Sequence, residues 1–138
     1  YFPDREALFG AVATEVFPRI AHCLTVTPAP GGVAARATEL VGLRLELARH
    51  TAGLSRSVER LAPSSRLSAA LLAVRNDRLQ EQVRAWFAPE LALAPAGAAA
   101  TVDVLLSTPS ITHLQELLGD EALADELAGA VVRLLAPA

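Results

Sequence analysis

Apolar residues recur every three or four positions along most of this chain, and that spacing strongly limits its fold. Near the start, the apolar residues at every fourth position are Leu8, Val12, Val16, Ile20 and Leu24. This period places side chains on one face of a helix, whereas strands have a period of two. Ala and Leu supply much of the 52% hydrophobic content, and strand-forming aromatic residues make up only 4%. The sequence therefore predicts an all-α fold.

Interruptions in this pattern predict about six helices in one domain, which is the number of domains expected from 138 residues. The first helix should start at Asp4, which caps it, and kink or break near Pro18. A loop is expected at 25–32, and residues 92–100 are interpreted either as a mobile linker or as the start of a helix. Further helices are expected at 33–49, 53–61 and 66–87, and from about Val102 to an end before Pro109, with the apolar pattern continuing from Ile111 to Leu118. The last helix is expected from Asp120, acting as a cap after Gly119, to about 135.

Charge and hydropathy exclude several classes of protein. The net charge of −3 provides no general cationic surface for nucleic acid. The single cysteine, Cys23, rules out an internal disulfide and fits a reducing compartment. Charged residues interrupt every apolar run before it could span a bilayer, and residues 4–6 are charged where a signal peptide would need apolar ones. We therefore expect a cytoplasmic protein with no membrane partner.

No common catalytic or phosphate-binding motif occurs in the sequence. The histidines lie on different expected helices, and His113 with Glu116 is interpreted as a solvated pair rather than a metal site. Cys23 is interpreted as a packed residue at a helix end, because the adjacent His22 points elsewhere on a helix. The sequence thus predicts no enzyme, no cofactor and no metal.

Charged and aromatic residues in the expected helices have two interpretations each. Arg44 and Glu46 lie in the most apolar helix, where each either reaches the surface or meets a polar ligand in a cavity. The surface is favoured for Arg44, and both alternatives stay open for Glu46. Trp86 and Phe87 are interpreted as core residues rather than a ligand platform.

Residues 1–9, Tyr-Phe-Pro-Asp-Arg-Glu-Ala-Leu-Phe, resemble the end of the DNA-binding unit in the TetR/AcrR family of bacterial transcriptional regulators. The stretch Trp-Phe-Ala-Pro-Glu-Leu at 86–91 and the Gly break at 119 are similar to that family's looser C-terminal pattern. The resemblance implies a TetR C-terminal-type helical bundle that dimerises through its last two helices. Residues 1–4 would be a remnant of the helix-turn-helix domain, and 5–138 the effector-binding and dimerisation domain.

The resemblance also implies a ligand-responsive regulator, most often a repressor. This chain would form a homodimer and bind a small apolar or amphipathic effector, with residues 8–24 as a lever towards DNA. DNA would be bound only by the full-length protein with its N-terminal helices, where Tyr1 and Arg5 would contact the backbone by motif match. The alternative is a helical protein interaction module with a solid core, which differs by having no cavity between residues 33–49 and 66–88.

Two sets of candidate residues follow from this interpretation. Those expected to line an effector pocket are Phe9, Phe17, His22, Leu43, Arg44, Leu47, Leu71, Val74, Trp86, Leu105 and His113. Those expected in the dimer interface are Val102, Leu106, Leu114, Leu118, Leu123, Leu127, Val131 and Leu134.

Overall fold

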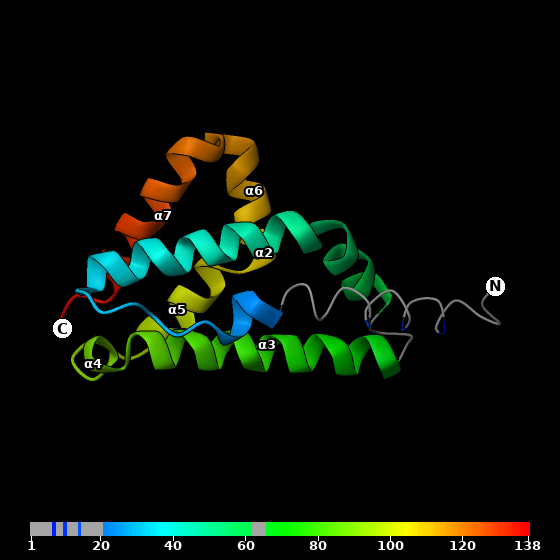
Figure 1. The fold of residues 1–138 in the computed structure, drawn as a ribbon, viewed down its shortest axis with the longest axis horizontal. Helices are drawn as coiled ribbons and strands as arrows, with labels where there is room; N and C mark the ends of the chain where they lie inside the picture. The colour runs from blue at the N-terminus through cyan, green and yellow to red at the C-terminus, as the bar shows by residue number, and fades with distance from the viewer. Residues whose placement is uncertain (1–6, 8–9, 11–13, 15–20, 62–65) are drawn as a thin grey trace.

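The computed structural model describes Ala7, Gly10, Thr14 and residues 21–61 and 66–138, and this part of the chain is helical without strands. Residues 21–25 are helical, and a loop at 26–32 leads into the first long helix. The elements that follow are α2 (Val33–Leu61), α3 (Arg66–Trp86), α4 (Ala88–Leu91), α5 (Ala98–Leu105), α6 (Thr108–Leu118) and α7 (Asp120–Leu134). The prediction of an all-α chain is confirmed (Figure 1).

Helix α2 is the central element of the fold. Its 29 residues span about 43 Å at 1.5 Å per residue. It contacts α3 along one side, while α6 and α7 form an arch that packs on the other (Figure 1). Helix α5 lies between these layers and contacts α3 and α7. The expected break between 49 and 53 is wrong, because one glycine such as Gly53 costs only about 1 kcal/mol in a helix interior, and α2 continues through it as it does through Gly42.

Two boundaries in the C-terminal half bear on the prediction. The helix expected to end before Pro109 ends at Leu105, and Ser107 starts the next helix by accepting a hydrogen bond from the Ser110 amide. Pro109 lies in the first turn of α6, where its missing N–H is not needed. Asp120 is the first helical residue of α7, and Gly119 occupies the cap position with φ 77°. Leu106 and Ile111 both reach the core because the chain turns between them.

The main hydrophobic core lies where α2, α3, α5, α6 and α7 meet. Its largest fully buried side chains are Phe87, Leu40, Leu106, Ile111, Leu123, Leu127, Val41, Val83, Val102 and Val131. Trp86 is buried in the same cluster, which confirms the interpretation of both aromatic residues as core. Cys23 packs with Leu47 and Leu79 in a second cluster, as expected for a packed cysteine.

Arg36 fixes α4 against α2. Its guanidinium donates to the Trp86 carbonyl at 2.6 Å and to both carboxylate oxygens of Glu90 at 2.6 and 2.9 Å. The guanidinium carbon also lies 5.8 Å from the centre of the Phe87 ring. Hydrogen bonding to Arg36 lowers the pKa of Glu90 and keeps this carboxylate charged.

Candidate functional site

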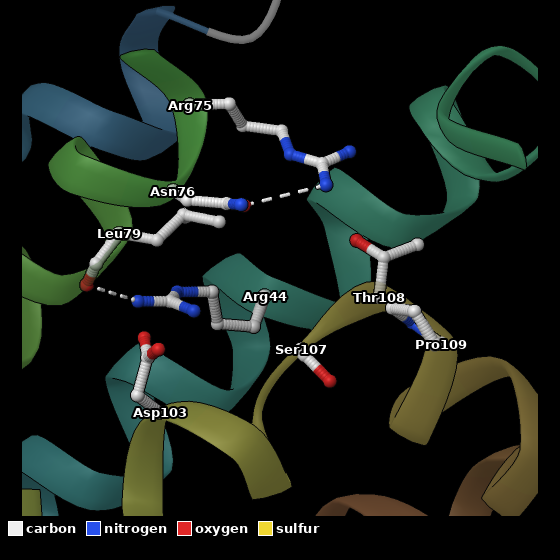
Figure 2. A pocket seen from close by; sticks show the side chains of 8 residues that line it. All are labelled: Arg44, Arg75, Asn76, Leu79, Asp103, Ser107, Thr108 and Pro109. Carbon is white, nitrogen blue, oxygen red and sulfur yellow. Dashed lines mark hydrogen bonds between the residues drawn. The ribbon is translucent and has the colours of Figure 1, made fainter. Parts of the chain in front are cut away.

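A polar pocket lies where α2 and α3 pass the turn between α5 and α6 (Figure 2). Its lining residues are Arg44, Arg75, Asn76, Leu79, Asp103, Ser107, Thr108 and Pro109. The cavity volume is about 40 Å³. Because one water needs about 10–15 Å³ by this measure, the space holds a few waters or the head group of a small ligand.

Arg44 forms the floor of this pocket and is only 2% exposed. Its Nε donates to Gln82 Oε1 at 3.0 Å, and its Nη2 donates to the Leu79 carbonyl at 2.9 Å. The Nη1 contact to the Leu106 carbonyl is longer, at 3.4 Å. All three acceptors are neutral, so these bonds orient the guanidinium without neutralising its charge. The expectation that Arg44 reaches the surface is wrong.

The helical spacing of α2 explains this burial. Leu40, Val41, Leu47 and Ala48 are buried and lie three or four residues from Arg44, which places its Cβ on the same face. Burial lowers the Arg44 pKa to about 10, although the negative charge of Asp103 acts in the opposite direction. Arg44 is therefore protonated at neutral pH.

Asp103, on α5, is the acidic wall of the pocket (Figure 2). Burial raises its pKa, and the positive charges of Arg44 and Arg84 oppose that shift. In the described part of the chain, no carboxylate oxygen lies within 4.0 Å of an Arg44 guanidinium nitrogen, the distance that defines an ion pair. Among the described residues, the positive charge of Arg44 is therefore balanced by Asp103 without direct contact.

Gln82 connects Arg44 to the helical residues 21–25. It is buried, accepts from Arg44, and donates from Nε2 to the Cys23 carbonyl at 2.7 Å. This gives a continuous buried line of hydrogen bonds from the pocket to the helical residues 21–25. Gln82 was not among the residues predicted from sequence, although the sequence contains a signal for it. Gln82 lies at i+3 from Leu79 and i−4 from Trp86, on the buried face of α3.

The structure places only Arg44, among the expected pocket residues that it describes, in this cavity. Leu47 and Trp86 are buried in the hydrophobic clusters, and Leu43 and Leu105 are half-buried against the main core. These side chains are taken up by packing within the described part of the chain, and the pocket at Arg44 has a mostly polar lining. The remaining candidates are exposed, namely His22, Val74 and His113. Phe9, Phe17 and the Leu71 side chain lie outside the described residues, as do Tyr1 and Arg5.

The expected dimer-interface residues divide into two groups. The side chains that are buried within the subunit are Val102, Leu106, Leu123, Leu127 and Val131. They are unavailable to a second subunit in this conformation, because α2 and the neighbouring helices already cover them.

The other expected interface residues are more exposed than the buried group. Leu114 and Leu134 are half-buried, and Leu118 is exposed. Leu117, which the sequence analysis did not select, is 65% exposed beside it. A partner subunit meeting α6 would therefore contact Leu117 and Leu118 first.

Two further expectations concern metals and membranes. His113 and Glu116 are both exposed, and the described residues hold no cluster of three metal-ligating side chains. Glu46 is half-buried. No helix in the described ranges has both the length and the hydropathy needed to cross a membrane.

Comparison of the chain with protein-family models, with curated proteins and with solved structures finds no match. Function is therefore inferred from the pocket and from the residues that surround it.

Proposed function

We propose that this chain is the effector-binding and dimerisation part of a TetR-type transcriptional regulator that acts in the cytoplasm as a ligand-relieved repressor. Its role is binding rather than catalysis, and DNA is read by helices carried only in the full-length protein. The TetR-like residues 1–9 and the all-helical fold support this proposal. The observation that carries it is the pocket whose buried Arg44 is hydrogen-bonded through Gln82 to Cys23.

The hydrogen-bond line provides a route from ligand to lever. A ligand that competes for the Arg44 guanidinium changes its bonds to Gln82 and the Leu79 carbonyl. Gln82 in turn holds the Cys23 carbonyl at the end of residues 8–24, the segment that the resemblance assigns as the lever. A ligand shifts such an equilibrium only by its difference in affinity for the two arrangements, so it must bind them unequally.

The effector class follows from the lining. We expect an apolar or amphipathic effector from the sequence, and six of the eight residues that line the pocket are polar or charged. An amphipathic molecule with its polar end beside Arg44 fits this lining better than a wholly apolar one.

Native mass spectrometry of the purified chain tests the proposal. We expect a dimer, and a dimer that carries a discrete small-molecule adduct would support both parts of the proposal at once. The adduct mass would also identify the ligand by formula. A clean monomer without adduct at micromolar concentration would contradict it.

The second candidate function is a helical protein interaction module. The cavity volume of about 40 Å³ favours this alternative, because small-molecule sites usually measure about 300 Å³ or more. In such a module the exposed apolar residues Val104, Leu117 and Leu118 would contact a different protein. A monomer that binds no small molecule but forms a stoichiometric complex with another protein would favour it.

A further inference from the structure

We infer that the Arg44 pocket binds the head group of a neutral primary amide, whose carbonyl oxygen accepts from Arg44 and whose N–H donates to Asp103. This inference rests on the proposed function and names the ligand class of the same site. Arg44 lies on α2 and Asp103 on α5, and Figure 2 shows the Asp103 carboxylate directed towards the Arg44 guanidinium. Among the described residues, these two opposite charges border one small space without forming an ion pair.

Arg44 has two N–H groups to spare for such a ligand. A guanidinium has five, and Arg44 uses three of them in the hydrogen bonds described above. All three acceptors are neutral, and the bond to the Leu106 carbonyl is long, at 3.4 Å. In the described part of the chain, Arg44 has no further hydrogen-bond acceptor. A carbonyl oxygen in the cavity would accept from the remaining N–H groups.

The Asp103 carboxylate lacks a donor. Within the described ranges, no side chain or backbone group donates a hydrogen bond to it, and no cationic nitrogen lies within 4.0 Å of it. The side chain is half-buried, and burial raises its pKa. A carboxylate that has lost part of its hydration is stabilised by hydrogen bonds donated to it. An N–H group of a ligand in the pocket would provide one.

The charges that face a ligand select a neutral one. Arg44 and Asp103 balance each other, so a bound anion would leave an excess negative charge beside Asp103, and a bound cation an excess positive charge beside Arg44. Arg84 acts on Asp103 from an exposed position outside the lining, where water and salt screen its charge. Arg75 also borders the pocket, but it is engaged in other interactions. We therefore assign the selectivity to Arg44 and Asp103.

A primary amide carries the required acceptor and donor in one small planar group. Its carbonyl oxygen accepts on one side, and its N–H groups donate on the other. A head of this size suits a cavity of about 40 Å³, which otherwise holds a few waters. A zwitterion is larger and loses the hydration of two charges on binding. Leu79 and Pro109 provide an apolar border for a short aliphatic tail.

Titration of the ¹⁵N-labelled chain with propionamide, followed by ¹H–¹⁵N NMR at constant ionic strength, tests the inference. Two controls have the same shape: butan-2-one has a methyl group in place of the NH₂ group, and propionate has a charged oxygen there. We expect saturable shifts of the pocket residues and of the Arg44 Nε–H with propionamide. Both controls should bind about tenfold or more weakly, because each lacks the hydrogen bond to Asp103.

Two results would overturn the inference. One is a control that binds as tightly as propionamide, since recognition would then not depend on the N–H group. The other is the absence of saturable shifts with propionamide, which would show that the cavity holds water alone.

Asp103→Asn gives a test that a loss of folding does not imitate. The neutral side chain is a weaker acceptor for an amide and no longer repels an anion. We therefore expect propionamide binding to weaken and propionate binding to tighten, so that the preference between the two probes is reversed. Asp125→Asn makes the same change at an exposed position on α7 outside the pocket, and it should leave both affinities unchanged. Weaker binding of both probes in Asp103→Asn, or an unchanged preference, would refute the role of Asp103.

Failure of the inference is distinguishable from failure of the proposed function. A dimer that carries an acidic adduct in native mass spectrometry, together with no propionamide binding, would overturn the amide inference and leave the regulator proposal standing. A monomer that binds propionamide would do the reverse.

Discussion

Arg36 and Glu90 form a bidentate ion pair between α2 and α4. The pair is partly open to solvent, because the two side chains are 14% and 21% exposed. We predict that a double-mutant cycle with Arg36→Gln and Glu90→Gln gives a coupling energy of about 0.5–1 kcal/mol at neutral pH. Glu90→Gln removes the charge and keeps the shape of that side chain, and the cycle cancels the other contacts of Arg36, so the coupling energy reports the contact between Arg36 and Glu90. Urea denaturation of the four proteins measures it.

The same pair predicts a pH dependence. The Arg36 hydrogen bond lowers the Glu90 pKa in the folded state. Its stabilisation is therefore present above the unfolded pKa and is lost as the pH falls through the folded one. The coupling energy should disappear in acid, and a coupling that persisted once Glu90 is protonated would contradict this assignment.

Arg44 illustrates how much of the site could be predicted from sequence. Its spacing from Leu40 and Leu47 places it on the buried face of α2, and a charge there needs partners. The partners themselves are 35 to 62 residues away, at Leu79, Gln82 and Leu106. Periodicity within one helix does not encode how two helices are shifted along each other. The need for a partner was therefore predictable, and its identity was not.

At the scale of elements, Gly119 makes the turn that joins α6 to α7. Its backbone angles, φ 77° and ψ 162°, lie in a region that residues other than glycine rarely adopt. We predict that Gly119→Ala lowers the free energy of unfolding by about 1–3 kcal/mol. Nothing lies within 4 Å of a Cβ added there, so the loss would report backbone strain rather than a clash.

Gly42→Ala is the matched control for that substitution. Gly42 is exposed in the middle of α2, and a Cβ there also meets nothing within 4 Å. Because alanine has the higher helix propensity, this change should raise stability by about 0.5–1 kcal/mol. Thermal or urea unfolding would show the two opposite signs, and a loss of similar size in both variants would disprove the argument from φ.

Element boundaries were predictable where a residue type enforces them. The loop at 26–32 and the break at Gly119 follow from Pro and Gly, and α3 ends within one residue of its predicted end. The break between α5 and α6 was expected before Pro109, but its position at residues 106–107 was not. That position depends on Ser107 capping and on burying Leu106 and Ile111 together, which is a tertiary effect.

For the whole molecule, the proposed dimer places exposed apolar surface of α6 in an interface. Leu117 and Leu93 are both 65% exposed, but Leu117 lies on α6 and Leu93 follows α4. We predict that Leu117→Gln weakens dimerisation, because it adds a polar group to the contact, whereas Leu93→Gln leaves it unchanged. Light scattering after size exclusion over a dilution series measures both. An equal effect of the two variants would argue against α6 as the interface.

The burial of Cys23 makes its rate of alkylation a measure of local opening of the fold. Its thiol is covered by Leu47 and Leu79, and burial together with the nearby Glu46 charge raises its pKa, so the reactive thiolate is scarce. Alkylation must then wait for the junction of residues 21–25 with α2 and α3 to open locally. The rate at which Cys23 is alkylated should therefore fall when an effector occupies the Arg44 pocket, because Gln82 links the two sites. An alkylation rate that stays the same at saturating ligand would show that occupation of the pocket does not change the opening of this junction.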